Sequence, residues 1–298
     1  MRSAWAKLFG TMGLAGRASA AQMNKSQFSS QIAQLQEHRR KLLETPRLAD
    51  PRRLIKFGYR VYSQSDEDGI LHEIFRRIGE GGRTFVELGS GDGVENNSLF
   101  LLVQGWRGLW LEGSARRVAA AKKALAEPIR EGRLKVVQHF VTAANIDTAI
   151  QRNTPSKDID LLSIDLDGND YYVLDAIRSV HPRVIVAEYN AKYPSDVAWV
   201  MEYNEAHRWD GTDYFGASLK ALAMLLARRG YALVGCNLLG CNAFFVRQDL
   251  ALDPPFCSPF TAENHYEPPR YYLLQAFATG FPLGIGPSKI INGTKDDD

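Results

Sequence analysis

The sequence predicts an α/β protein with a Rossmann-like, doubly wound, mostly parallel seven-stranded sheet that ends in an antiparallel C-terminal hairpin strand. Three observations predict this fold. Short apolar runs alternate with helical patterns between residues 58 and 250, which is typical of parallel strands covered by helices on both faces. Only four residues, 238–241, join the last two strands, and so short a link allows an antiparallel hairpin. A glycine-rich turn follows the first strand, where such folds bind ligands.

The first element is a helix predicted over residues 24–44. Its apolar residues Phe28, Ile32, Leu35 and Leu42 recur at three- and four-residue steps, which is the period of an amphipathic helix. We expect this apolar stripe to pack on the main domain. Pairing with a second copy of the chain, and hence a homo-oligomer, is the alternative.

The main domain then begins with a helix over residues 66–78, for which Ser65 is a possible cap, and a strand over residues 84–88. A helix over residues 99–104 follows and ends at Gly105. Further strands are predicted at 108–113, 134–141, 159–167, 183–190, 231–237 and 242–248. Further helices are predicted at 115–127, 171–180 and 216–230.

We therefore divide the chain into an N-terminal helical arm, residues 1–57, a main domain, residues 58–250, and a C-terminal extension, residues 251–298. The acidic end of the extension, "TKDDD", is expected to be disordered. The first 22 residues resemble a signal peptide, but Lys7 interrupts their short apolar stretch. We expect a frayed lead-in there rather than an export signal.

Composition excludes several classes of protein. The net charge of +2 is too small to indicate a nucleic-acid partner. No apolar stretch approaches the roughly 18 residues of a membrane span. The three cysteines form neither a disulfide framework nor a zinc site, so we interpret them as free thiols and expect a cytoplasmic protein.

The glycine turn lacks the spacing that binds phosphates. Gly89, Gly91 and Gly93 are separated by Ser90 and Asp92, whereas the dinucleotide fingerprint is G-x-G-x-x-G and no G-x-x-x-x-G-K-[ST] loop occurs. The absence of a Cβ lets a ligand approach the backbone of this turn closely. The turn therefore predicts a ligand without a diphosphate.

Two glutamates refine this prediction. Glu87, just before the turn, would repel a diphosphate but can bind an ammonium group. Glu112 ends the second strand, 19 positions after Gly93, where an acidic residue accepts ribose hydroxyls. Gly113 and Ser114 follow it. Together these residues predict a zwitterionic ligand that carries a ribose and no phosphate, a description that S-adenosylmethionine meets.

The order of motifs resembles that of class I S-adenosylmethionine-dependent methyltransferases, and more narrowly that of the FkbM-like family. The resemblance runs from about Tyr62 to Arg247 and rests on "YSQSDEDGILHEIF", "FVELGSGDGVENNS", "GWRGLWLEGS", "LLSIDLDGNDYYVLDAI" and "RVIVAEYN". It implies a methyltransferase domain over residues 58–250 that methylates a hydroxyl oxygen of a glycan or related metabolite. Asp167 stands where the family more often has glutamate.

Polar residues follow the fourth and fifth strands, where open α/β sheets bind ligands. Asp165 is expected to orient the cofactor amine or the acceptor, and Asp167 to accept the proton or bind the acceptor hydroxyl. Asn169 is a candidate for substrate hydrogen bonding. Glu188 ranks second as an acid–base residue, and Asp170 is expected to cap the following helix.

A metal ion is the competing interpretation of these acids. Asp165 and Asp167 with Glu188 or Asn190 offer only oxygen ligands, which suit Mg²⁺. Mg²⁺ is therefore kept as a possible cofactor, without an assigned metal ligand. The twelfth position counted from Asp165 is Ala176, so this is not a calcium loop of the EF-hand type.

An irregular polar–aromatic stretch between the fifth strand and the next helix is a candidate substrate lid. Its rings and carboxylates would suit a sugar, and ordinary loop packing is the equal alternative. Gln64 is a candidate for closing the other side of the pocket. The candidate lid residues are Tyr203, His207, Trp209, Asp210, Asp213 and Tyr214.

The sequence thus predicts an S-adenosylmethionine-dependent O-methyltransferase acting on a small-molecule or glycan hydroxyl. Two alternatives stay open at this stage. One is a Rossmann-type NAD-dependent oxidoreductase, which the glycine spacing and Glu87 disfavour. The other is a non-catalytic binding module that retains the fold for assembly.

Overall fold

The computed structural model describes residues 25–154, 156–251 and 256–277. The signal-like N-terminus and the acidic "TKDDD" end lie outside these residues. The seven strands are β1 (Thr84–Leu88), β2 (Arg107–Glu112), β3 (Leu134–Gln138), β4 (Leu161–Ile164), β5 (Val184–Glu188), β6 (Tyr231–Cys236) and β7 (Asn242–Arg247).

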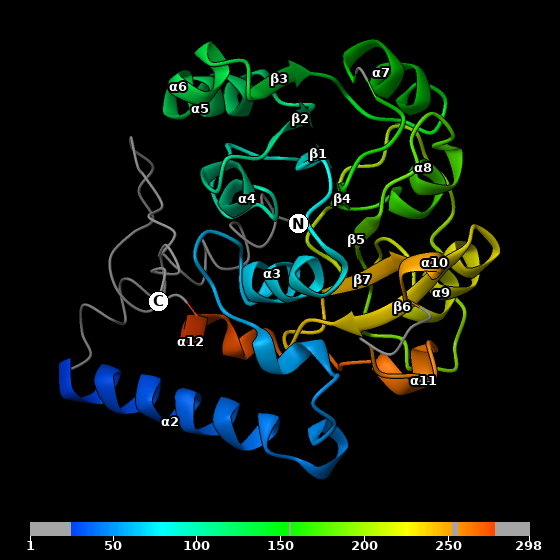
Figure 1. Ribbon diagram of the computed structural model, residues 1–298. Helices are drawn as coiled ribbons and strands as arrows, with labels where there is room; N and C mark the ends of the chain where they lie inside the picture. The colour runs from blue at the N-terminus through cyan, green and yellow to red at the C-terminus, as the bar shows by residue number, and fades with distance from the viewer. Residues whose placement is uncertain (1–24, 155, 252–255, 278–298) are drawn as a thin grey trace, which may run out of the picture.

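One sheet contains all seven strands in the order β3-β2-β1-β4-β5-β7-β6 (Figure 1). The neighbours from β3 to β5 pair in parallel. β7 pairs antiparallel with both β5 and β6, so the final hairpin folds back and places its second strand inside the sheet. The predicted fold class is confirmed: a doubly wound, mostly parallel sheet with an antiparallel C-terminal strand.

The helices cover both faces of the sheet, as the alternation predicts. The longer ones are α3 (Glu67–Ile78), α5 (Ala115–Ala124), α7 (Ile146–Asn153) and α9 (Leu219–Arg228). The shorter ones are α4 (Leu99–Val103), α6 (Ala126–Arg130), α8 (Asp170–Ala176), α10 (Gln248–Ala251), α11 (Ala262–His265) and α12 (Leu274–Phe277). Three 3₁₀ turns are η1 (Pro46–Leu48), η2 (Leu54–Phe57) and η3 (Tyr271–Leu273).

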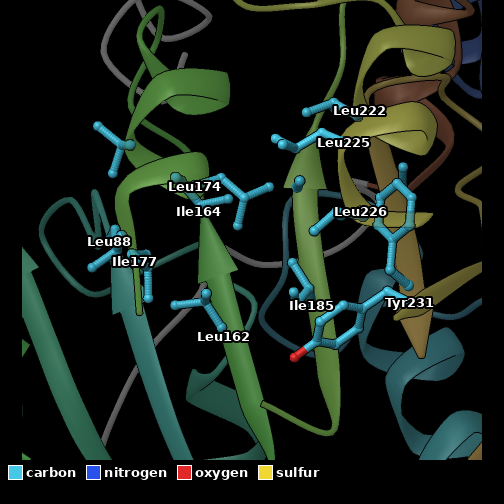
Figure 2. Packing of buried hydrophobic residues seen from close by; sticks show 14 of the residues in the cluster. Leu88, Leu162, Ile164, Leu174, Ile177, Ile185, Leu222, Leu225, Leu226 and Tyr231 are labelled. Carbon is cyan, nitrogen blue, oxygen red and sulfur yellow. The ribbon is translucent and has the colours of Figure 1, made fainter. Parts of the chain in front are cut away.

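Alternate residues of each strand enter two separate cores, because successive side chains of a strand point to opposite faces. On one face, Leu88, Leu162 and Ile185 pack against α7, α8 and α9. Figure 2 shows this layer, with Leu174 of α8 and Leu225 of α9 directed at the strands. On the other face, the intervening strand residues pack against α3, α4 and α5. The strands are thus held rigidly, and their carboxyl ends can present polar groups in fixed positions.

The predicted N-terminal helix is α2 (Lys25–Leu43), and it lies beside α12 (Figure 1). Leu35, Leu42 and Leu43 pack on a small cluster that includes residues of the β6–β7 turn. Gln36 donates a hydrogen bond to the Ala276 carbonyl at 2.6 Å. The expectation that the apolar stripe packs on its own chain is therefore confirmed for Leu35 and Leu42, whereas Phe28 is 48% exposed. A homo-oligomer through α2 stays a prediction.

The segment before β1 is tied to the β6–β7 turn by buried polar groups. The amides of Asn237 and Asn242 each donate to Glu67 at 2.9 Å, and Leu238 N–H donates to Asp66 at 3.0 Å. All four polar side chains are buried. Ser65 does not cap α3, as had been expected: the N-cap is Asp66, and the Ser65 hydroxyl donates to the two carboxylates beside it.

All three cysteines are buried free thiols, as predicted. Among the described residues, the helices are all too short or too polar to traverse a lipid bilayer.

Candidate functional site

A cleft of about 570 Å³ lies beyond the carboxyl ends of β1, β2, β3 and β4. This volume falls within the range of small-molecule sites. Seven of the predicted site residues line it: Gly89, Glu112, Gly113, Ser114, Asp165, Asp167 and Asn169. The other lining residues are Leu111, Arg116, Arg117, His139, Phe140, Val141, Leu166, His207, Arg208 and Trp209.

The glycine turn follows β1 and packs closely against the loop after β4. Gly89 has φ +78°, and a Cβ there would lie 1.9 Å from the Asp165 carbonyl oxygen. At Gly93, with φ +87°, a Cβ would lie 2.8 Å from the Trp110 ring. These two glycines are therefore required by the packing of the turn itself. Of the turn residues 89–93, Gly89 alone is among those that line the cleft.

Glu87 lies beneath the turn, fully buried. Its carboxylate accepts hydrogen bonds from the backbone N–H groups of Asn97 and Ser98, at 3.0 and 3.2 Å, and from the Ser98 hydroxyl. These donors lie at the N-terminus of α4, where a negative charge is stabilised by unpaired N–H groups. Glu87 thus anchors α4 and is not among the residues that line the cleft.

Glu112 bridges the first two strand ends. One of its oxygens accepts from Gly91 N–H at 2.8 Å, and the other accepts from Ser114 N–H at 2.8 Å. Its carboxylate therefore has a fixed direction, and each oxygen keeps a second lone pair for another donor. The Arg117 guanidinium nitrogen Nη1 lies 4.0 Å from the Glu112 oxygen Oε1. This geometry is suited to accepting two neighbouring hydroxyls from a ligand in the cleft.

The loop after β4 is shaped by Asp170. Its buried carboxylate accepts from Leu166 N–H at 2.8 Å and from Gly168 N–H at 3.0 Å. Burial, and then the neighbouring charge of Asp165, raise the pKa of Asp170. The expectation that Asp170 caps the helix is wrong: it is the first residue of α8, and its carboxylate binds the preceding loop. Asp167 adopts a left-handed backbone with φ +61°, which is uncommon outside glycine.

The three predicted acids converge. One oxygen from each of Asp165, Asp167 and Glu188 lies within 4.8 Å of the others, although Glu188 comes from the end of β5 and is buried. This spacing would let the three groups share a cation. An acidic cluster alone does not establish a metal site, and Mg²⁺ stays a prediction of the sequence.

The irregular stretch before α9 covers one side of the cleft. His207 and Trp209 line it, as the lid interpretation requires. The side-chain amide of Asn169 holds this stretch through two hydrogen bonds to the backbone of Asn204. Its nitrogen donates to the Asn204 carbonyl at 2.7 Å, and its oxygen accepts from Asn204 N–H at 3.3 Å. Asn169, proposed for substrate binding, thus also positions the lid.

The remaining candidate lid residues contact other parts of the protein. Asp213 pairs with Lys192, and Asp210 accepts from the Thr212 hydroxyl and N–H. The rings of Tyr203 and Tyr214 pack edge-on against Tyr172 and Trp199 respectively.

Three polar residues near these loops are not among those that line the cleft. Tyr189 is buried and donates to the Glu267 carbonyl at 2.7 Å. The buried Asn190 amide donates to the carbonyls of Asp213 and Phe215. Gln64 lines a separate small hollow with Leu239, Cys241, Tyr271 and Leu274.

Sequence reasoning missed the basic and aromatic wall of the cleft. Arg116 and Arg117 stand in the first turn of α5, and Phe140 follows β3. The Arg208 guanidinium lies 5.1 Å from the centre of the Phe140 ring. The rule that ligands bind beyond the carboxyl ends of strands, applied also to the third strand, would have indicated His139 and Phe140.

Comparison with known proteins places methyltransferases among the structural neighbours. An O-methyltransferase from Bacillus cereus in complex with SAH has 15% identity and a TM-score of 0.38, covering 72% of this chain and 89% of its own. The glycopeptide N-methyltransferase MtfA, complexed with S-adenosyl-L-homocysteine, has 18% identity and a TM-score of 0.39, covering 68% and 98%. A SAM-dependent methyltransferase from Aquifex aeolicus has 12% identity and a TM-score of 0.38, covering 71% and 98%.

No family model and no curated protein matches the chain, so the FkbM-like resemblance is not confirmed. The structural likenesses are too distant to assign an activity to this protein.

Proposed function

We propose that this protein is an S-adenosylmethionine-dependent methyltransferase of the FkbM-like type, which methylates a hydroxyl of a glycan or related small molecule. The observation that carries the proposal is Glu112. Its buried carboxylate is fixed by the N–H groups of Gly91 and Ser114, lines the cleft, and can accept both hydroxyls of a ribose.

The environment of the glycine turn supports a cofactor without a diphosphate. Glu87 places a buried carboxylate directly beneath the turn and uses the α4 N–H groups that a phosphate would otherwise bind. In this proposal Gly89 lies beside the amino-acid end of the cofactor, and Ser90, Gly91, Asp92 and Gly93 form the rest of the turn behind it. Gly113 and Ser114 lie beside the ribose.

The opposite wall would hold the acceptor. When bound, S-adenosylmethionine supplies a methyl group already activated on a sulfonium. The protein must then align the acceptor hydroxyl with it and take up one proton. We assign Asp165, Asp167, Asn169 and Glu188 to orienting the acceptor and the cofactor amine, because all but Glu188 line the cleft and Glu188 adjoins the two aspartates.

Calorimetric titration tests this proposal. We expect the protein to bind S-adenosylhomocysteine and not NAD⁺, and Glu112→Ala to weaken binding roughly 10- to 100-fold, since hydrogen bonds to a charged group contribute about 1.5–3 kcal/mol. Glu112→Gln retains an acceptor for one of the two backbone N–H groups and controls for loss of loop structure. Glu127→Ala, an exposed glutamate of α6, should bind as the wild type does.

Unchanged affinity in Glu112→Ala would remove the ribose assignment. Binding of NAD⁺ in place of S-adenosylhomocysteine would favour an oxidoreductase. Transfer of labelled methyl from the cofactor to metabolite and glycan fractions of a cell extract separates an enzyme from a non-catalytic module.

A further inference from the structure

His207 lies directly on the loop that follows β4. A Cβ added to Gly168 would lie 2.3 Å from His207 Cδ2 and 2.8 Å from Nε2. The absence of a side chain at Gly168 therefore lets the imidazole rest on the backbone between Asp167 and Asn169. A histidine from the lid is thus brought to the same strand end as the predicted acids, 39 positions away along the chain (207 − 168).

The position of this imidazole is fixed from two directions. His207 N–H donates to the Asn204 carbonyl at 2.8 Å, which closes a tight turn around the residue. The Asn169 amide binds both polar groups of the Asn204 backbone. The loop after β4 therefore holds the turn that carries His207, so the ring has a defined place in the cleft.

His207 Nε2 is buried and makes no hydrogen bond to any part of the chain that the structure describes. Burying an imidazole nitrogen without a partner is costly. The residue nevertheless lines the cleft together with Gly89 and Asp165. A hydroxyl that reaches Nε2 would supply the missing partner.

We infer that His207 is the general base of this site and accepts the acceptor's hydroxyl proton on Nε2; the inference rests on the proposed methyl transfer. As the acceptor oxygen bonds to the methyl carbon, the carbon–sulfur bond breaks and its electron pair stays on sulfur. The sulfonium becomes a neutral thioether, and the hydroxyl proton moves to Nε2. Histidine is the side chain that most often performs this task.

The charges around His207 favour this direction of proton transfer. Asp165 and Asp167 line the same cleft, and Asp210 interacts electrostatically with His207. The Asp210 carboxylate therefore stabilises the imidazolium that forms. Arg208, the nearest cation in sequence, has its guanidinium over the Phe140 ring. Asp210 therefore serves as an electrostatic partner of the base.

The test uses the full-length protein and four substitutions. His207→Gln removes the base. Gly168→Ala retains the histidine but adds a methyl group that must displace its ring. We expect each to slow methyl-label transfer into an extract by at least ~100-fold while binding S-adenosylhomocysteine as the wild type does. His181→Ala removes an exposed histidine and should leave the rate unchanged. Free imidazole should partly restore His207→Ala, because it replaces the base.

A second readout does not depend on turnover. ¹⁵N NMR of the S-adenosylhomocysteine complex, with His207→Gln to identify the signal, should show that the neutral ring carries its proton on Nδ1 and leaves Nε2 free to accept. A protonated Nε2 in the neutral ring would overturn the inference, as would wild-type rates in His207→Gln. A wild type that fails to bind S-adenosylhomocysteine, or binds it and labels nothing, would instead refute the proposed function, and the inference with it.

Discussion

Gly89 is the residue at which the glycine turn and the acid-bearing loop after β4 meet. Its left-handed backbone brings the chain within contact of the Asp165 carbonyl. A side chain at this position would separate the two strand ends that form the cleft. The glycine is therefore needed for the shape of the site, whichever ligand occupies it.

Gly89→Ala should lower the free energy of unfolding more than Gly132→Ala. Both glycines have positive φ, +78° and +70°, so both substitutions cost about 1–2 kcal/mol in backbone strain. A Cβ at Gly132 meets nothing within 4 Å, whereas one at Gly89 meets the Asp165 carbonyl at 1.9 Å. Overpacking adds about 1–3 kcal/mol. Equal losses in the free energy of unfolding, measured in urea, would contradict the close approach of Gly89 to the Asp165 carbonyl.

Asp66 is a second residue whose environment has a measurable consequence. Burial, and then the charge of Glu67, raise its pKa to about 7, from an ordinary value of about 4 in an unfolded chain. The folded state thus holds this proton more tightly than the unfolded state does. The resulting stability is complete below the unfolded pKa and is lost as the pH rises through about 7.

Asp66→Asn should therefore gain stability relative to the wild type as the pH rises from about 5 to about 8, by on the order of 1–3 kcal/mol. The substitution keeps an oxygen to accept Leu238 N–H. Asp68 and His265, with pKa values of about 6 and about 4, titrate in both proteins and cancel in the difference. Urea unfolding of both proteins at the two pH values measures this difference in the free energy of unfolding. A difference that does not change with pH would refute the raised pKa of Asp66.

Residue spacing predicted the position of Glu112 but not the partners of Glu87. Glu112 follows from its place at the end of the second strand. The donors to Glu87 are backbone N–H groups ten and eleven positions later, and such local capping depends on the exact path of the loop. The ammonium partner expected for Glu87 stays a prediction.

At the scale of elements, a side chain at the α8 N-terminus holds the part of the lid that carries His207. The Asn169 amide makes two hydrogen bonds to Asn204. The sequence indicated an irregular polar stretch, but its lack of periodicity could not indicate which of its residues would reach the cleft. His207 reaches it because Gly168 leaves room for the ring.

Asn169→Ala should loosen the lid without unfolding the sheet. We expect faster amide hydrogen exchange over residues 204–209, because local opening becomes easier once its hydrogen bonds are removed. Asn153→Ala is the matched control, since that amide also donates to a backbone carbonyl, that of Ala149, away from the cleft. Unchanged exchange in Asn169→Ala would show that the lid is held by other contacts.

Two helices could not be predicted correctly from the periodicity of apolar residues alone. The eight-residue α7 was not predicted, because it is short and includes two isoleucines and a threonine, which have modest helix propensity. The helix predicted over residues 115–127 ends at Ala124 and is followed by α6. Pro128 explains the break, since it has no N–H to donate to the Ala124 carbonyl.

At the scale of the whole molecule, the cleft lies where the strand order changes direction. The chain runs from β1 outward to β3, then returns to place β4 on the other side of β1. The loops after β1 and β4 diverge there and leave the crevice in which such folds bind ligands. The alternation of apolar runs predicted a doubly wound, mostly parallel sheet, but not the full order of its strands.

The basic and aromatic wall could not be predicted from the same pattern. Arg116, Phe140 and Arg208 come from three separate elements, and their meeting depends on how those elements pack. The account of the cofactor rests instead on Glu112 and the turn beside it.

A crystal structure grown with equal, saturating concentrations of S-adenosylhomocysteine and NAD⁺ tests that account most directly. We predict density for S-adenosylhomocysteine in the cleft, with both ribose hydroxyls on the Glu112 carboxylate and the amino-acid end beside Gly89. Density for NAD⁺ across the glycine turn, or a cleft that contains neither compound, would contradict it.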